Sequence, residues 1–563
     1  MRKYIIHSKY KFALLIFLKL LNTVVFMYFS VLIKDIINVA MDQSESYNLP
    51  HYIMLGVGYC ILLIACYIAV ASVHSFYMNE ATYLMKRDYC RKLFLMPYDE
   101  FTQKESATYI SNLSNDMSMI RSGYLEEIFA IIDSAMSIIV AFVFIWEIDK
   151  SIAIYVLIAA SVLPLFPIAM EKKMMAADKR ISDANEQYTA ELKMIFSGMN
   201  VVKTFSAAGI MMKRFNKVNT EVKKSKIHND LLIIGLSSMS TTVTNIIKIG
   251  LVIIGVFYAL QKRIDVGSVT ALFVLSSSFY NPVMSLCYQI GDIMGTKSVV
   301  QKINTVLNMD IDTENSFDIN KRVERLTLDN VSFRYTDQKM ALQNVNLCFE
   351  AGKKYLIIGE SGSGKTTLFK LLLKMSSGYS GNIYLNETEY SDIGENVIYE
   401  KIGYAQQDSY IFNGSLKENI DIIGTNDEKK LMECIKKCRL EKFVNNLSDG
   451  INTNIGEEIN KISVGEKLRI CLARTLYKDC EVLLLDEITS ALDPVNSVEV
   501  EKVIMSITDK IVINICHKFS RDTLSQYDKI IILENGQVVE FGSFDELINN
   551  SVKFKNYLLK SVG

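Results

Sequence analysis

The stretch Gly359-Glu360-Ser361-Gly362-Ser363-Gly364-Lys365-Thr366 has the spacing G-x-x-x-x-G-K-[ST], which is typical of loops that bind phosphate groups. An apolar run, Tyr355 to Ile358, precedes it and predicts a strand, and a helix is expected from Thr366 onward. Glycines let backbone N–H groups turn inward around phosphates, and the start of a helix adds its dipole. The stretch therefore predicts a nucleotide site, against the alternative of a structural Gly-rich turn.

Two side chains of this loop have expected roles of their own. The ammonium of Lys365 would reach the terminal phosphates, and the hydroxyl of Thr366 would be a ligand of Mg²⁺. The residues expected to hold the nucleotide here are Gly359, Ser361, Gly362, Ser363, Gly364, Lys365, Thr366 and Thr367.

A second motif is the apolar strand predicted from Val482 to Leu485, which ends in Asp486 and Glu487. Two adjacent carboxylates at the end of a strand can divide two tasks. Asp486 would hold Mg²⁺, and Glu487 would polarise the attacking water. Such a pair is often only a strand end, but beside a phosphate loop it predicts nucleotide hydrolysis.

The surrounding sequence, from about Val323, alternates short β-branched strands with polar helices, which predicts an α/β domain with a largely parallel sheet. The first 300 residues differ, because they hold six apolar runs long enough to cross a bilayer. We expect a membrane domain over 1–307, a linker over 308–322 and a nucleotide-binding domain over 323–563. The six runs are Phe12 to Ile33, Tyr52 to Val73, Ile128 to Trp146, Ile152 to Met170, Leu236 to Leu260 and Val269 to Ile290.

Composition and charge agree with this division. The chain has 563 residues, half of them hydrophobic, with 61 Lys and Arg against 62 Asp and Glu. A net charge of −1 disfavours a general nucleic-acid binder. Basic residues lie near the N-terminus and after the second run, whereas the loop from Met41 to His51 has none. Positive residues in the connections are retained on the cytoplasmic side of a membrane. Both termini are therefore expected in the cytoplasm, although Lys262 and Arg263 lie in a connection that this topology puts outside.

Three ionisable residues fall inside the predicted spans: Lys19, Asp133 and Lys248. Charges at this depth are costly and raise a functional hypothesis. We expect Lys19 to extend toward the inner boundary. For Asp133 and Lys248 two interpretations stay open: an ion pair with each other, or a place on a water-filled substrate path.

With these features in one chain, the sequence resembles ABC exporters of the half-transporter kind. The resemblance implies an all-α domain of six transmembrane helices, followed by an α/β P-loop ATPase domain with a helical subdomain, and ATP and Mg²⁺ as ligands. The segment Phe101 to Asp116 resembles the first intracellular coupling segment of that family, and Gly198 to Lys203 resembles part of the second.

The resemblance also implies further site residues. Tyr335 matches the aromatic that stacks on adenine, and Gln407 matches the glutamine that senses Mg²⁺. Asp493 lies in the matching dimer-contact loop, and His517 matches the histidine that contacts the γ-phosphate. Glu487, His517 and Lys365 are thus the expected catalytic residues.

One motif departs from the family. The signature LSGGQ reads Ile462-Ser463-Val464-Gly465-Glu466 here, so Ser463 and Gly465 remain while Val464 and Glu466 are replacements. In the family this motif contacts the γ-phosphate of ATP held by the opposite subunit. The replacements are either tolerated drift or a weakened contact. The second interpretation, with Glu487 and His517 kept, favours pairing with a different half-transporter.

The expected function is an ATP-driven exporter subunit of a bacterial plasma membrane, which moves a peptide or an amphipathic small molecule through the lipid bilayer. The alternatives are a homodimeric multidrug or lipid exporter and a nucleotide-gated regulatory or channel-type ABC protein with low turnover. An importer is disfavoured, because importers of the family keep the two parts on separate chains.

Overall fold

The computed structural model describes residues 1–41, 49–309, 322–335, 340–406, 410–456, 462–489, 492, 494–516 and 521–561. The chain forms two compact units. The first comprises 1–94 and 106–309, and the second comprises 95–105 and 310–563.

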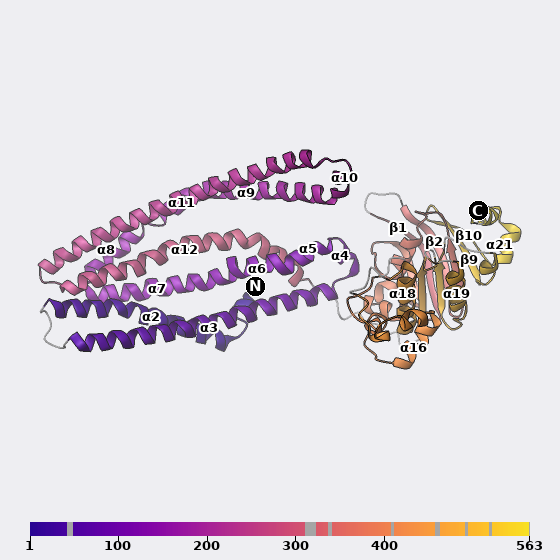
Figure 1. Cartoon of the computed structure of the whole chain (residues 1–563), viewed down its shortest axis with the longest axis horizontal. Coiled ribbons are helices and arrows are strands. Elements are labelled where there is room, and N and C mark those ends of the chain that lie inside the picture. The colour runs from indigo at the N-terminus through magenta and orange to yellow at the C-terminus, as the bar shows by residue number, and fades with distance from the viewer. Residues whose placement is uncertain are drawn as a thin grey trace. The chain divides into compact units, whose positions relative to one another are not determined.

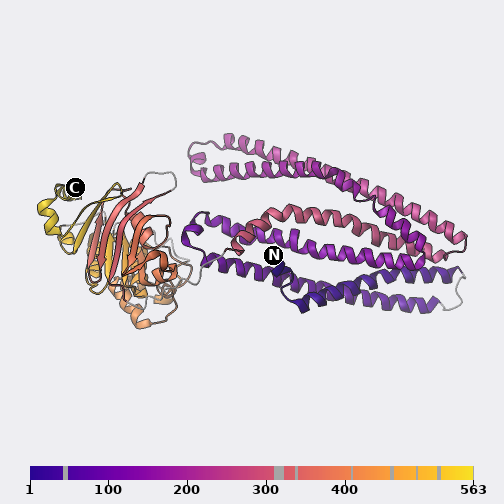
Figure 2. The ribbon, with the colours of Figure 1, turned by 180° about the vertical axis from the view of Figure 1, so that it is seen from behind.

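The first unit consists of helices. They are α1 (Arg2–Ile5), α2 (Lys9–Ala40), α3 (Leu49–Leu95), α5 (Ser106–Ser111), η1 (Asn112–Asp116), α6 (Met117–Ile120), η2 (Arg121–Glu126), α7 (Glu127–Ile148), α8 (Lys150–Ala160), α9 (Leu165–Ser197), α10 (Met199–Thr204), α11 (Ala208–Leu260) and α12 (Val266–Leu307). Figures 1 and 2 show that α9 lies beside α11, and α7 beside α12. Buried apolar side chains of α7, α8, α11 and α12 form one hydrophobic core of this unit.

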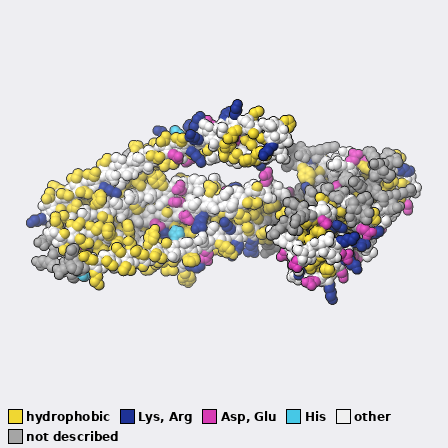
Figure 3. Space-filling view, in the orientation of Figure 1, with side chains coloured by type: hydrophobic (Ala, Val, Ile, Leu, Met, Phe, Trp, Pro, Cys, Tyr) yellow, Lys and Arg dark blue, Asp and Glu magenta, His cyan; other side chains and the backbone are white. Residues whose placement is uncertain are grey.

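Five helical segments of the described chain are long and apolar enough to cross a membrane: Lys9–Ala40, His51–Leu95, Ser106–Ile148, Ala208–Leu260 and Val266–Leu307. On the face drawn in Figure 3, hydrophobic side chains dominate the end of this unit that carries α8, and charged side chains gather toward α10. A surface of this kind suits a helix bundle that continues beyond a bilayer.

The fourth predicted span, Ile152 to Met170, does not form one helix, and this expectation was wrong. The helix α8 ends at Ala160, and α9 begins at Leu165. Between them the N–H groups of Ser161, Val162 and Leu163 bond to carbonyls three residues earlier. Pro164 follows, and a proline has no N–H and disfavours the α conformation of the residue before it.

The charged residue Lys19 is buried inside the bundle. Its side chain is 4% exposed, and its Nζ lies 2.5 Å from Oδ2 of Asp133, which is 45% exposed. The expectation that Lys19 extends to the membrane boundary was therefore wrong. The partner of Asp133 is Lys19 rather than Lys248, because α2 packs against α7.

We predict that this ion pair stabilises the bundle. Asp133→Asn would leave the Lys19 ammonium without its carboxylate and lower the free energy of unfolding by about 1 to 3 kcal/mol. The double variant Lys19→Met with Asp133→Asn should recover most of that loss. Thermal unfolding in detergent measures both, with Glu147→Gln, on the same helix and exposed, as the control. Equal melting temperatures for Asp133→Asn and Glu147→Gln would contradict the prediction.

The second unit is built on two sheets. The smaller is antiparallel, in the order β2-β1-β4-β5, and the larger has the order β10-β9-β3-β8-β7-β6. In the larger sheet β9, β3, β8, β7 and β6 are parallel, and β10 pairs antiparallel with β9. The strands are β1 (Arg325–Arg334), β2 (Met340–Glu350), β3 (Lys354–Ile358), β4 (Ser380–Leu385), β5 (Thr388–Glu389), β6 (Ile402–Ala405), β7 (Val482–Asp486), β8 (Ile511–Ile515), β9 (Lys529–Glu534) and β10 (Gln537–Gly542).

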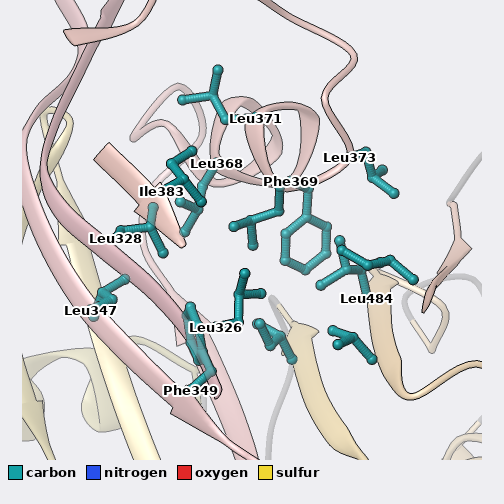
Figure 4. Close-up of a cluster of buried hydrophobic side chains, with 14 of the residues drawn as sticks. Leu326, Leu328, Leu347, Phe349, Leu368, Phe369, Leu371, Leu373, Ile383 and Leu484 are labelled. Carbon is teal, nitrogen blue, oxygen red and sulfur yellow. The ribbon is translucent and has the colours of Figure 1, made fainter. Parts of the chain in front are cut away.

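The helix α13 (Lys365–Leu372) is buried among strands of both sheets. Leu368 and Phe369 are fully buried, and Figure 4 shows them with Leu326 of β1, Ile383 of β4 and Leu484 of β7 in one hydrophobic cluster. Fully burying a side chain of this size contributes about 1.5 to 3 kcal/mol. The start of α13 is therefore held firmly.

A separate hydrophobic core lies in the helical part of this unit. It includes buried residues of α16 (Glu428–Lys437) and α18 (Val464–Lys478). The other helices of the unit are α4 (Tyr98–Thr102), η3 (Tyr390–Asp392), α14 (Glu395–Lys401), α15 (Leu416–Ile420), α16 (Glu428–Lys437), α17 (Glu441–Asn445), η4 (Gly450–Asn452), α18 (Val464–Lys478), α19 (Pro494–Met505), α20 (Arg521–Leu524), α21 (Phe544–Asn550) and α22 (Val552–Ser561).

The short helix α4 comes from the first half of the sequence but groups with the second unit. The backbone N–H of Ser377 donates to Oδ2 of Asp99 at 3.3 Å, and its hydroxyl donates to the same oxygen. The backbone of Tyr98 hydrogen-bonds to the Glu395 carboxylate. The segment 95–105, which lies inside the membrane domain we expected over 1–307, is thus part of the second unit.

Candidate nucleotide site

The loop Gly359 to Thr366 connects β3 to α13, as its sequence context predicts. Gly364 has a φ of +107°, and a Cβ there would stand 2.5 Å from the Ala341 carbonyl oxygen. Gly362 has a φ of +78°, with open space where its Cβ would be. Both positions need glycine for their backbone conformation, and only Gly364 needs it for space as well.

Lys365, the first residue of α13, has a buried side chain whose ammonium stays on its own loop. Its Nζ donates to the carbonyl oxygens of Gly359 at 2.8 Å and Glu360 at 3.0 Å. Burial lowers the pKa of this ammonium, and the carboxylates of Glu487 and Asp486 partly raise it again. The structure therefore brings the loop lysine and the two predicted acids together.

These acids lie where β7 ends. The carboxyl ends of the parallel strands β3, β7 and β8 meet at one edge of the sheet, which places Asp486 and Glu487 beside the loop. The Glu487 N–H donates to the Ile515 carbonyl oxygen at 3.0 Å, and its φ is +53°. A left-handed glutamate costs about 1 to 3 kcal/mol and occurs where a site requires one orientation.

Asp486 has a partner that our sequence reasoning missed. The Tyr404 hydroxyl, on the neighbouring strand β6, donates to Oδ2 of Asp486 at 3.2 Å. Burial, and then the charge of Asp486, raise the pKa of Tyr404 above its usual value. Nothing in the sequence shows that β6 and β7 are neighbours, because about 80 residues separate them.

The predicted adenine-stacking residue also lies close to the loop helix. The Tyr335 hydroxyl is 3.4 Å from Oγ1 of Thr367, and its ring packs edge-on against Phe333 with a centroid separation of 4.9 Å. Thr367 and Ser363 are buried, whereas Thr366 and Ser361 are exposed. Thr366, the predicted metal ligand, is thus an exposed residue at the start of the helix.

The altered signature stands at the start of α18. Ser463 is the N-cap, and Oε2 of Glu466 accepts hydrogen bonds from its N–H at 2.8 Å and its hydroxyl at 2.7 Å. The Glu466 N–H donates back to the Ser463 hydroxyl at 3.3 Å, which completes a capping box. A carboxylate thus binds the serine that the resemblance assigns to the γ-phosphate.

Val464 and Gly465 of the signature differ in their surroundings. Val464 is 59% exposed, so its side chain covers the surface at the beginning of the helix. A Cβ at Gly465 would come within 2.8 Å of the Leu492 side chain. Three predicted site residues, Gln407, Asp493 and His517, lie outside the described residues.

Comparisons with known proteins agree with both halves of this architecture. The model of the ABC transporter transmembrane region matches residues 12–283, and the ABC transporter model of the ATP-binding part matches residues 342–490. The chain belongs to the ABC transporter family. It is an ATP-hydrolysing transporter that crosses the membrane several times, and its membrane and ATP-binding parts share one chain. The expected fold class is confirmed.

Curated relatives align over most of the transporter. It is 26% identical over 492 residues to the uncharacterized ABC transporter ATP-binding protein YwjA of Bacillus subtilis, covering 86% of this chain and 84% of that protein. It is 25% identical over 536 residues to the ATP-dependent lipid A-core flippase of Salmonella typhimurium, covering 92% and 89%.

A solved structure has the same fold. The bacterial Atm1-family ABC exporter with ATP bound matches with a TM-score of 0.85 and 18% identity, covering 98% of this chain and 99% of that one.

The two loop glycines make a matched test of the site's geometry. Gly364→Ala should lower the melting temperature of the nucleotide-free transporter more than Gly362→Ala does. Both substitutions force alanine into a left-handed backbone, at a cost of about 1 to 2 kcal/mol. Only Gly364→Ala also brings a Cβ onto the Ala341 carbonyl oxygen. Equal shifts in a thermal-unfolding experiment would contradict this geometry.

Proposed function

We propose that the transporter is an exporter subunit that hydrolyses ATP at its own site and pairs with a different half-transporter. The observation that carries the proposal is an asymmetry within one chain. Lys365 lies within the electrostatic influence of Asp486 and Glu487, which suits hydrolysis, whereas the Ser463 hydroxyl of the signature donates its hydrogen bond to Glu466.

In this proposal each residue of the site has one task. The loop backbone and Lys365 bind the phosphates, and Tyr335 stacks on adenine. Glu487 accepts a proton from the attacking water. Bound Mg²⁺ would neutralise phosphate charge, and the oxygens of Thr366 and Asp486 fit it because hard cations prefer oxygen ligands. Gln407, Asp493 and His517 keep the roles that the family resemblance implies.

The Glu487 role can be tested by Glu487→Gln. Glutamine keeps the shape but cannot take the proton, so steady-state hydrolysis should fall by about 10²-fold or more. Binding of a fluorescent ATP analogue should be retained. Glu387→Gln, an exposed position in the turn between β4 and β5, is the control and should leave both unchanged. Unaltered hydrolysis by Glu487→Gln would remove Glu487 from the mechanism.

The pairing proposal rests on the charge of Glu466. Losing a charge-assisted hydrogen bond to phosphate costs about 1.5 to 3 kcal/mol, or roughly tenfold to a hundredfold in affinity. A homodimer would lose it at both sites. A heterodimer would lose it at one, because the partner's signature would face Lys365 and Glu487.

We therefore expect low ATPase activity from the transporter reconstituted alone. The double variant Val464→Gly with Glu466→Gln should raise that activity about tenfold or more. Glu418→Gln is a matched control, because Glu418 forms the same capping box with Ser415 on α15. High activity of the unaltered chain alone, abolished by Glu487→Gln, would instead support a homodimer.

The transported molecule is proposed as a peptide or an amphipathic small molecule. The lipid A-core flippase relative favours a second candidate, a homodimeric lipid exporter. We place the transporter in a bacterial plasma membrane, with both termini and the nucleotide-binding unit in the cytoplasm.

A further inference from the structure

A small polar cavity lies between α11 and α12, and both helices belong to the first unit. Its volume is about 200 Å³. Hydroxyl and amide groups line it, together with one charged side chain, Lys248. The described residues of its lining include no Asp or Glu.

The predicted span places Lys248 far from both of its ends. It is the central residue of the predicted span Leu236 to Leu260, and α11 continues to Leu260. Twelve residues of helix extend over about 18 Å at 1.5 Å per residue, which exceeds the reach of a lysine side chain. Within that predicted span the ammonium therefore lies at the depth where an isolated charge is most costly.

Two other cations of the first unit, Lys19 and Arg121, have anionic partners. Lys19 is bonded to Asp133, and Nε of Arg121 lies 3.1 Å from Oε1 of Glu126. Both pairs line a larger cavity of about 540 Å³, where the charges compensate one another. For Lys248, the described part of the chain supplies no carboxylate within ion-pair distance.

A second group in the small cavity also lacks a partner. The Ser240 side chain is 4% exposed, and its buried hydroxyl has no hydrogen-bond partner among the described residues. The neighbouring Thr244 hydroxyl is already engaged, because it donates to the Ser240 carbonyl oxygen at 2.9 Å. An unsatisfied buried hydroxyl costs about 1 to 3 kcal/mol, so it needs an acceptor or donor from elsewhere.

We propose that Lys248 and Ser240 bind the anionic end, a carboxylate or a phosphate, of the transported molecule. One ligand group would satisfy both side chains, since its oxygens accept from the ammonium and from the hydroxyl. Asn245 and Asn281, which line the same cavity, can donate N–H groups to it. This inference rests on the proposed export function and narrows its substrate class to acidic amphiphiles.

The size of the cavity sets a limit on what enters it. Sites that enclose a whole drug-sized molecule have about 300 to 1,000 Å³. A cavity of about 200 Å³ therefore accommodates a charged headgroup, while the apolar remainder of the ligand extends beyond it.

The test is equilibrium binding of radiolabelled dodecyl phosphate to the full chain in lipid nanodiscs, without nucleotide. Lys248→Gln should weaken binding about tenfold to a hundredfold, the range of one charge-assisted hydrogen bond. Ser240→Ala should weaken it by about two- to tenfold, and Lys248→Arg should retain it. Lys226→Gln, an exposed position on the same helix, is the control and should bind like the unaltered chain.

Equal binding by the unaltered chain and Lys248→Gln would overturn the proposal, as would equal binding of dodecyltrimethylammonium and dodecyl phosphate. Competition by millimolar inorganic phosphate would support the anion site but assign it to a free anion, and lack of competition would assign it to the amphiphile. Because no ATP is present, a failure of the predicted anion binding is distinct from a failure of the proposed hydrolysis. The Glu487→Gln measurement tests the hydrolysis separately.

Discussion

The burial of α13 among strands of both sheets is the constraint on which the nucleotide site depends. Leu368 and Phe369 lock this helix in place, so the preceding loop has one path and Lys365 one position. The same sheet carries Asp486 and Glu487 to the edge where the loop lies. Packing thus sets the positions of Lys365 and of the two acids relative to one another.

A common rule governs the charges in both units. A buried charge is tolerated where a partner compensates for its lost hydration. The Lys365 ammonium donates to carbonyl oxygens of its own loop and is stabilised by the negative charges of Glu487 and Asp486. The Lys19 ammonium forms an ion pair with Asp133. Lys248 has hydroxyl and amide neighbours instead, which explains why the cavity around it, rather than the larger one, is the candidate for an external anion.

The signature region shows how one local interaction can alter a shared motif. Glutamate at the third position of α18 is a good capping residue, and its bonds to Ser463 stabilise the start of the helix. The same bonds place a negative charge at the surface where the family binds a phosphate of the opposite subunit. In the pairing that we propose, local helix stability and phosphate contact would therefore compete for one serine.

The sequence alone determined the two-part architecture, the phosphate loop and the strand that ends in Asp486, because hydrophobic periodicity and glycine spacing are local properties. The sequence also held the signal for the break in the fourth span, because Pro164 lies within the apolar run, but the expectation of one continuous helix did not use it. Tertiary structure alone decided the pairing of Lys19 with Asp133, the contact of Tyr404 with Asp486, the bond of Ser377 to Asp99, and the uncompensated surroundings of Lys248. The physical reason is that these depend on which helices and strands become neighbours, and that choice is made by packing over long sequence separations.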